Sequence, residues 1–413
     1  MNIGVIATRL NGTDGVSLEV EKWVRVLERM GHAMFYCAGE LGGYASSGTL
    51  VPQLHFTHLQ VHALSERAFI ELSDDVEELL ADIHSLTTQI QSALQDFVEA
   101  NHIDLILVEN AQAIPMNLPL GVALKQLIEG AGIRTIAHHH DFYWERPRYQ
   151  RNHILDLLDS AFPSDAPNIR HVTINTIAQR RLKARRDIDS IVIPNVHDFA
   201  KPPVRIDDYN RDLRAELSFT EDDFLVLQPT RVVRRKGIEK ALMLLKELGI
   251  PNTKLLITHG TSDEGEAYWR WLSREAAVMQ VDLRLVEDRV DTQRGQANGH
   301  KIYSLWDVYP HADLVTYPSD YEGFGNALLE TVYYKRLMVV NSYPVYNADI
   351  GPLGFDFVEL DGFVDEDAIQ HLKKLLDSPA KVQEIVTKNY DIALKHFSLE
   401  VLEEKLHQVL DTF

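Results

Sequence analysis

A dense group of cationic side chains lies within residues 228–237, between an apolar run and a segment of helical periodicity. It contains Arg231, Arg234, Arg235 and Lys236. A helix N-terminus offers unpaired backbone N–H groups and a partial positive charge, and arginine and lysine add to both. The pattern predicts a diphosphate-binding loop, with a solvated basic loop as the alternative.

Two carboxylates, Glu322 and Glu330, belong to a second strand-to-helix loop at residues 317–330. Gly323 and Gly325 permit unusual backbone angles and let a ligand approach the main chain closely. Glu330 lies about 7–8 Å further along the predicted helix, at a rise of about 1.5 Å per residue. The two carboxylates could therefore accept hydrogen bonds from hydroxyl groups at two ends of one ligand. The alternative is that Glu322 caps the helix and Glu330 is solvated.

Three adjacent histidines, His138, His139 and His140, follow an apolar run in the N-terminal half of the chain. Neighbours in an extended segment point to opposite faces, so at most His138 and His140 could share one ion. Because the chain has only one cysteine, Cys37, no further cysteine ligand supports such a site. We therefore expect no metal here.

Arginines and aromatic residues alternate directly after these histidines, a combination that suits a sugar ring beside an anionic group. The residues concerned are Tyr143, Trp144, Arg146, Arg148, Tyr149 and Arg151. This pattern favours a small, anionic ligand that contains a sugar, such as a glycosylglycerate. Pairing of these arginines with surface carboxylates is the alternative.

The two C-terminal loops together resemble the signature of the family-4 retaining glycosyltransferases, which have the GT-B fold. Glu322 and Glu330 form the pattern Glu-x7-Glu, which opens with Glu-Gly-Phe-Gly. Arg231 and Lys236 match the family's Arg-x4-Lys-Gly element, one strand–helix unit into the second domain. The order and spacing of these motifs carry the resemblance.

Weaker motifs extend the resemblance over nearly the whole chain. Residues 193–195 resemble the Ile-Pro-Asn that closes the family's first domain, and residues 11–16 resemble its glycine-bearing first loop. Residues 333–340 depart from the family, which commonly has a small residue and glycine before Pro-Val-Val. That departure concerns the sub-family and not the chemistry.

The resemblance implies a donor site for a nucleotide-diphosphate sugar, linked to GDP or UDP, and no metal cofactor. Arg231 and Lys236 would neutralise the departing diphosphate, and Glu330 would accept hydrogen bonds from the ribose. Glu322 would bind a hydroxyl group of the donor sugar. The neighbouring backbone would complete the donor site, through Gly15, Gly323, Phe324, Gly325 and Asn326.

On the acceptor side, His140 and Asp141 match a His-Asp step that the family places near the transferred sugar. A histidine bonded to backbone is the alternative for His140. The resemblance therefore gives His140 a catalytic role beside Arg231, Lys236 and Glu322. The expected acceptor-binding residues are Asp14, His140, Asp141, Tyr143, Trp144, Arg146 and Arg148.

Short apolar runs alternate with helical segments along the chain, which indicates α/β domains with parallel sheets covered on both faces. A proline-rich stretch at residues 194–203 interrupts this alternation. We predict an acceptor-side Rossmann-like domain over residues 1–195, a linker over 196–205 and a nucleotide-sugar-binding Rossmann-like domain over 206–391. The C-terminal helix, from about 392 to 413, would pack back onto the first domain. Two such doubly wound domains would face an interdomain cleft.

The composition of the chain limits the classes of molecule that it could bind. The chain has 413 residues and a formal net charge of −20, which disfavours binding to nucleic acid or to anionic membranes. Residues 66–99, where relatives that use lipid acceptors carry a basic helix, are strongly acidic and favour a soluble acceptor. No apolar run approaches the roughly 18 residues of a membrane span, and we expect a cytoplasmic protein.

The sequence thus predicts a retaining, metal-independent hexosyltransferase that moves glucose or mannose to a soluble acceptor. No side chain presents itself as a covalent nucleophile, so we expect transfer on one face of the sugar. A non-catalytic nucleotide-sugar-binding module and a GT-B-like sugar-nucleotide epimerase are the alternatives. The base, the sugar, the linkage and the oligomeric state stay open, a homodimer included.

Overall fold

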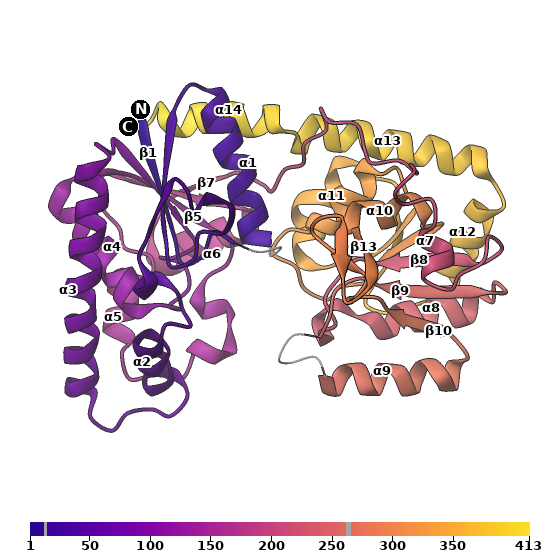
Figure 1. The fold of residues 1–413 in the computed structure, drawn as a ribbon, viewed down its shortest axis with the longest axis horizontal. Helices are drawn as coiled ribbons and strands as arrows, with labels where there is room; N and C mark the ends of the chain where they lie inside the picture. The colour runs from indigo at the N-terminus through magenta and orange to yellow at the C-terminus, as the bar shows by residue number, and fades with distance from the viewer. Residues whose placement is uncertain (12–14, 262–265) are drawn as a thin grey trace. The chain divides into compact units, whose positions relative to one another are not determined.

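The chain forms two compact units, seen in a computed structural model that describes residues 1–11, 15–261 and 266–413. Unit 1 comprises Met1–Val196 and Leu399–Phe413, and unit 2 comprises His197–Ser398. Each unit is built on its own parallel sheet, flanked by helices (Figure 1). The predicted class, two doubly wound Rossmann-like domains, is confirmed.

Unit 1 contains a seven-stranded parallel sheet in the order β3-β2-β1-β4-β5-β6-β7. Its strands are β1 (Asn2–Ala7), β2 (Ala33–Ala38), β3 (Gly48–Leu50), β4 (Leu105–Glu109), β5 (Arg134–His139), β6 (Ile169–Thr173) and β7 (Ser190–Val192). Alternate residues of β1 enter different cores, with Ile3 and Val5 in one and Ile6 in the other. The strands are apolar on both faces because both faces are covered by helices.

The helices of unit 1 cover both faces of this sheet. They are α1 (Gly15–Arg29), α2 (Leu59–Phe69), α3 (Val76–Ala100), α4 (Leu118–Ala131), α5 (Leu155–Ala161), α6 (Thr176–Arg186) and α14 (Leu399–Leu410). Residues of α3 and α4 fill one core, and residues of α1 and α14 fill the other. The last helix of the chain is therefore part of the N-terminal unit.

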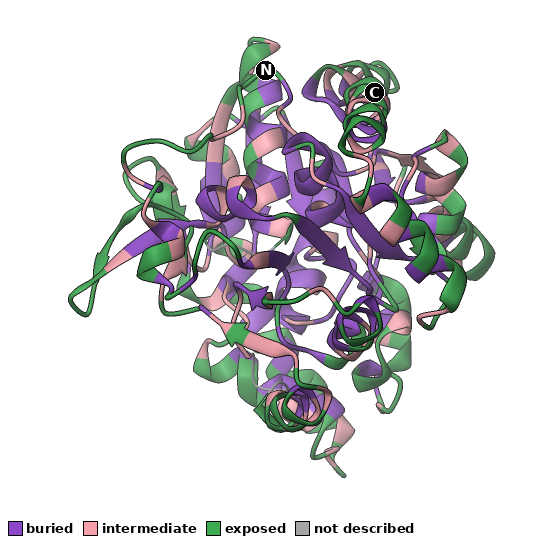
Figure 2. Ribbon diagram, turned by 90° about the vertical axis from the view of Figure 1, so that its right-hand side faces the viewer, coloured by how far each residue is buried: buried purple, intermediate pink, exposed green. Residues whose placement is uncertain are grey.

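Unit 2 contains a six-stranded parallel sheet in the order β10-β9-β8-β14-β15-β16. Its strands are β8 (Phe224–Gln228), β9 (Thr253–Ile257), β10 (Asp282–Leu285), β14 (Leu314–Tyr317), β15 (Met338–Asn341) and β16 (Val358–Leu360). Its helices are α7 (Leu213–Glu216), α8 (Ile238–Leu248), α9 (Glu266–Met279), α10 (Leu305–Val308), α11 (Asn326–Tyr333), α12 (Glu366–Leu376) and α13 (Pro379–Phe397). A small sheet of β11 (Val290–Asp291), β13 (His300–Ser304) and β12 (Gly295–Ala297) extends from it. Figure 2 shows buried strands inside and exposed residues on the outer helix faces.

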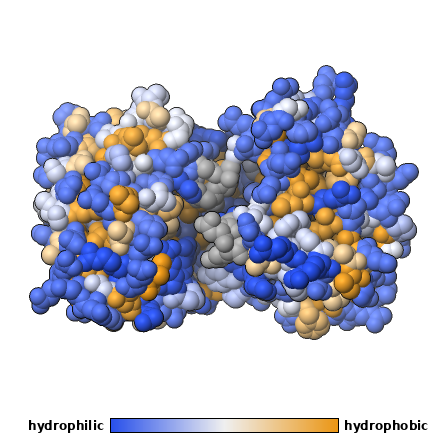
Figure 3. All heavy atoms as spheres, turned by 60° about the horizontal axis from the view of Figure 1, so that its bottom comes forward, coloured by the Kyte–Doolittle hydropathy of each residue, from blue (hydrophilic) through white to orange (hydrophobic). Residues whose placement is uncertain are grey.

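The surface is mixed in character. On the face seen in Figure 3, hydrophobic residues lie in patches among hydrophilic ones. Large exposed hydrophobic side chains include Leu59, Val278 and Phe363. No helix in the described parts of the chain is long and apolar enough to span a membrane.

The observed boundaries differ in detail from the expected ones. Unit 1 reaches Val196 where the prediction ended at 195, and residues 197–205 group with unit 2. The returning helix begins at Leu399 rather than at about 392, because α13 continues unbroken to Phe397. The three-residue edge strands β3 and β16 were not predicted, since such short runs carry little periodicity.

Leu406 of α14 tests the docking of the last helix on unit 1. Its side chain is fully buried in the core that α14 shares with α1 and β1. Replacement by alanine leaves a cavity there, so we expect the free energy of unfolding to fall by about 2–5 kcal/mol. Chemical denaturation followed by circular dichroism measures this loss.

Leu394→Ala is the matched control, because Leu394 of α13 is 42% exposed. We expect that variant to lose no more than about 0.5 kcal/mol. Equal losses in the two variants would contradict the packing of α14.

Candidate active site

Two strand-to-helix loops of unit 2 leave the same edge of its sheet, because β8 and β14 are parallel neighbours. The Asp320 backbone N–H donates to the Arg235 carbonyl at 2.8 Å and joins the loops. At Gly237 (φ +60°), a Cβ atom would stand 2.3 Å from the Pro318 carbonyl oxygen. Glycine after Lys236 is therefore required for this close approach.

A buried ion pair occupies the junction of these loops. Lys236 Nζ lies 2.5 Å from Glu322 Oε1, and Arg235 Nη1 lies 3.2 Å from Glu322 Oε2. Burial lowers the pKa of Lys236, and attraction to Glu322 opposes that effect. Burial also opposes ionisation of Glu322, but Lys236 and Arg235 lower the pKa of this carboxyl below its ordinary value. Glu322 is therefore a carboxylate that holds two cations in place.

Arg231 is exposed on the same loop, at its start. Its charge and that of Lys236 act on His259, which lies two residues beyond the end of β9. Burial, followed by these two cations, lowers the pKa of His259 to about 4. His259 is therefore a neutral polar group beside the cations at neutral pH. A lone histidine after a strand gave no signal in the sequence.

Glu330 lies on α11 and is held by a tyrosine. Tyr309 Oη donates to Glu330 Oε2 at 2.9 Å, and the Tyr309 ring stacks on Tyr334 with ring centroids 4.7 Å apart. Burial and the adjacent carboxylate raise the pKa of Tyr309, so its hydroxyl stays protonated. The alternative of a solvated Glu330 is wrong, because this residue is only 8% exposed.

The loop before α11 depends on glycine. Gly325 has φ +132°, and a Cβ atom there would stand 2.5 Å from Tyr343 Oη. That hydroxyl donates to the Phe324 carbonyl at 2.6 Å. Gly325 also occupies the N-cap of α11 without a side-chain cap, so the alternative that Glu322 caps this helix is wrong. Gly323 and Asn326, on either side, are partly exposed.

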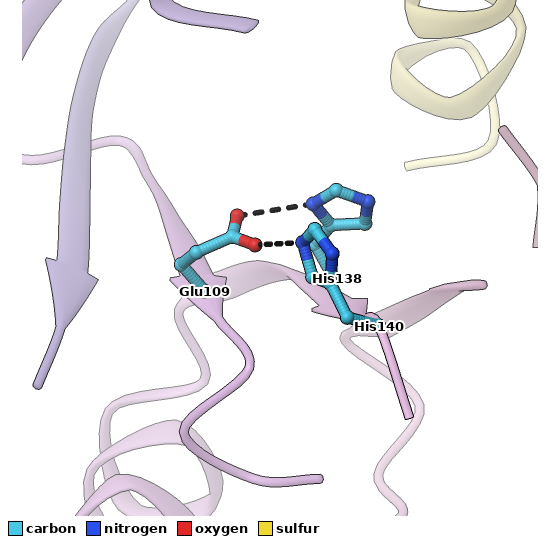
Figure 4. A group of neighbouring side chains, drawn as sticks. All are labelled: Glu109, His138 and His140. Carbon is cyan, nitrogen blue, oxygen red and sulfur yellow. Dashed lines mark hydrogen bonds and ion pairs between the residues drawn. The ribbon is translucent and has the colours of Figure 1, made fainter. Parts of the chain in front are cut away.

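In unit 1, the histidine segment forms a cluster with a glutamate that the sequence analysis missed. β4 and β5 are neighbours in a register that pairs Glu109 with His138. His138 Nδ1 lies 3.0 Å from Glu109 Oε2, and His140 Nε2 lies 2.6 Å from Glu109 Oε1 (Figure 4). Burial opposes ionisation of Glu109, but the two histidines hold its pKa at about 2. The alternative of a backbone-bonded His140 ring is therefore wrong.

The middle histidine points the other way, as the alternation along a strand predicts. His139 Nε2 lies 2.9 Å from His171 Nδ1 on the neighbouring strand β6. Burial lowers the pKa of His171 to about 3 and that of His139 well below its ordinary value. This pair is neutral and part of the interior.

The side chains of Glu109, His138 and His140 have the chemistry of metal ligands. Their ligand atoms lie within 4.8 Å of one another. Ligands of a tetrahedral ion with bonds of about 2.0–2.1 Å stand about 3.3 Å apart. The observed separations of 2.6 and 3.0 Å are hydrogen-bond distances, so the cluster is arranged around shared protons.

The predicted acceptor-binding segment folds into two short turns, η3 (Tyr143–Glu145) and η4 (Pro147–Tyr149). Arg146 Nε lies 2.6 Å from Asp141 Oδ2, and both Arg146 and Arg148 are exposed. Arg148 also donates to Ser65 Oγ at 3.4 Å. Both arginines therefore lie at the surface, and each has a partner within the protein.

The aromatic members of that segment are less accessible. Tyr143 is 3% exposed and donates to Asp159 Oδ1 at 2.9 Å, which favours a packing role. Trp144 is partly buried and stacks on Phe142, with ring centroids 4.6 Å apart. Asp14 lies outside the described residues with Gly12 and Thr13, and Gly15 is the exposed first residue of α1.

Comparison with known proteins shows which family and which fold this chain resembles. The family "Glycosyl transferases group 1" matches residues 210–391. The structure resembles sucrose-phosphate synthase from Thermosynechococcus elongatus, with a TM-score of 0.68 at 15% identity, over 99% of this chain and 98% of that one. That likeness concerns the fold alone, and the fold is GT-B.

Two relatives are closer in sequence, and both are named mannosylglucosylglycerate synthase. The protein of Petrotoga mobilis is 35% identical over 381 residues, which cover 87% of this chain and 86% of that one. The protein of Thermotoga maritima is 35% identical over 98% of this chain and 99% of its own. The chain belongs to the GT-B glycosyltransferases, in the family of these synthases.

Lys236→Met tests the cationic cluster. The variant removes one buried charge, while Arg235 still pairs with Glu322, so the fold should persist. We expect the dissociation constant of UDP or GDP to rise at least about tenfold, which is about 1.4 kcal/mol. Isothermal titration calorimetry measures both nucleotides.

Lys240→Met is the matched control, since Lys240 lies one turn further on α8 and pairs with Asp320 instead. Its nucleotide affinity should stay within about twofold of the unaltered protein. Undiminished affinity in Lys236→Met would contradict the assignment of the diphosphate to this loop.

Proposed function

We propose that this glycosyltransferase moves a hexose from a GDP- or UDP-linked donor to a soluble acceptor that contains glycerate. The names of the two sequence relatives favour mannose as the transferred sugar and glucosylglycerate as the acceptor. Glucose stays the second choice of sugar. The exposed Arg146 and Arg148 supply charge for the glycerate carboxylate.

The buried contact of Lys236 with Glu322 carries the proposal for the donor. A nucleotide-diphosphate leaving group gains negative charge as its bond to the sugar breaks. Cations fixed before the reaction stabilise that charge without reorganisation, and Glu322 fixes Lys236 and Arg235 in this way. Glu330, oriented by Tyr309, would accept hydrogen bonds from the ribose hydroxyls.

The proposed chemistry is direct transfer on one face of the sugar, with retention of its anomeric configuration. The acceptor hydroxyl oxygen forms a bond to the anomeric carbon while the bond to the diphosphate oxygen breaks. The departing phosphate oxygen takes the hydroxyl proton. Because Arg231, Arg235 and Lys236 supply the positive charge, we propose that no metal ion is needed.

Incubation with donors and acceptors tests the reaction directly. GDP-mannose, UDP-glucose and their base-exchanged counterparts are each offered with glucosylglycerate, with and without EDTA. We expect an α-linked disaccharide product, seen by mass spectrometry and NMR, at equal rates with and without the chelator. No turnover with any pair, an inverted anomer or a rate lost to EDTA would contradict the corresponding part of the proposal.

Arg148→Ala tests the acceptor side. Loss of one charge-assisted hydrogen bond should raise the KM for glucosylglycerate about tenfold, at little cost to kcat. Arg29→Ala is the control, because Arg29 ends α1 and pairs with Glu400 and Glu403 of α14. An unchanged KM for the acceptor in Arg148→Ala would show that Arg148 does not bind the acceptor.

A further inference from the structure

The Glu109 carboxylate, buried beneath His140, has no place in the chemistry described so far. We propose that Glu109 is a positioning residue that keeps His140 doubly protonated and directs its second N–H toward the acceptor. This inference rests on the proposed function for the identity of the acceptor. The part of the inference that concerns the charge of His140 does not depend on the proposed function.

The side chains of Glu109, His138 and His140 differ in their exposure to solvent. The side chains of Glu109 and His138 are completely buried, whereas that of His140 is 10% exposed. His140 uses Nε2 for its bond to Glu109. A ligand that reaches His140 would therefore meet the other ring nitrogen, Nδ1.

The carboxylate is itself held in place by the second histidine. His138 Nδ1 is directed at Glu109 Oε2, and the His138 ring stacks on Trp23 with ring centroids 4.2 Å apart. His138 Nε2 is buried and has no hydrogen-bond partner among the described residues. Glu109 Oε1 then remains for His140.

The backbone fixes the same geometry. The His140 N–H donates to Asn110 Oδ1 at 3.0 Å, and the Asn110 N–H donates to the His138 carbonyl at 2.9 Å. Asn110 directly follows Glu109 and has φ +54°, a conformation that asparagine tolerates better than most residues. The ends of β4 and β5 are thereby locked together.

The charges around His140 favour its protonated form. Burial lowers the pKa of His140, but the hydrogen bond and charge of Glu109, with the charges of Glu19 and Asp141, raise it overall. The neighbouring His139 is buried without a carboxylate partner, and its pKa is lowered well below the ordinary value. Neighbouring carboxylates, Glu109 first among them, therefore distinguish His140 from His139.

A protonated His140 offers an N–H donor that a neutral imidazole bonded through Nε2–H lacks. That donor suits a hydroxyl or carboxylate oxygen of a glycerate-containing acceptor. Because the pKa of His140 is raised, its cationic form persists to higher pH and is lost as the pH rises through that pKa. Transfer should decline on the same alkaline limb.

Glu109→Gln isolates the charge, because the amide oxygen can still accept from His140 Nε2–H. In protein labelled with ¹⁵N-histidine, we expect the pKa of His140 to fall by at least about one unit. The His140 signal is identified by its absence in His140→Asn. The alkaline limb of kcat/KM for the acceptor should move to lower pH by the same amount, while the dissociation constant of the nucleoside diphosphate is unchanged.

Glu359→Gln provides the matched control, since Glu359 of unit 2 likewise accepts a hydrogen bond, from Tyr346. It should alter neither the His140 titration nor the pH profile. A thermal melt of each variant separates loss of fold from loss of charge. The same His140 pKa in Glu109→Gln and the unaltered protein would overturn the proposal.

Titration with Zn²⁺ and with Mn²⁺ tests whether Glu109, His138 and His140 bind a metal ion instead. Stoichiometric metal binding that Glu109→Gln abolishes would also overturn the proposal. Failure of the proposed function can be told apart from failure of this inference. If the unaltered protein transfers no sugar, the titration of His140 can still be measured and compared with that of Glu109→Gln. Only the assignment of the acceptor would then fall.

Discussion

The arrangement of the proposed donor site depends on one buried ion pair, between Lys236 and Glu322. Burial of a charge in a protein is costly unless a partner and hydrogen bonds compensate for it. Here the pair joins the loops after β8 and β14, and Gly237 lets those loops approach closely. The buried ion pair thereby fixes the position of the Lys236 ammonium group at the edge of the sheet.

The same principle recurs at two other buried carboxylates. Glu330 is oriented by Tyr309 in unit 2, and Glu109 is shared by two histidines in unit 1. In each case a carboxylate is held by buried donors before any ligand binds. Sites prepared in this way lose little conformational freedom on binding and need little rearrangement during the reaction. Such preorganisation suits the proposed transfer, in which a departing diphosphate is stabilised.

Local spacing explains which parts of the site could be predicted from sequence. Arg231, Lys236, Glu322 and Glu330 each belong to a strand–loop–helix segment, so a short pattern identifies them. Glu109 was missed because its partners lie 29 and 31 residues further along and meet it only through the register of β4 and β5. Tyr143 was expected at the acceptor, and nothing in the sequence shows that its hydroxyl donates to Asp159. The two parallel sheets were predictable from alternation, but the short edge strands β3 and β16 were not.

A crystal structure with bound nucleoside diphosphate tests the central claim most directly. The account predicts diphosphate oxygens within hydrogen-bond distance of Lys236 Nζ, and ribose hydroxyls on the Glu330 carboxylate. A nucleotide bound away from both groups, with the Lys236–Glu322 contact undisturbed, would contradict it.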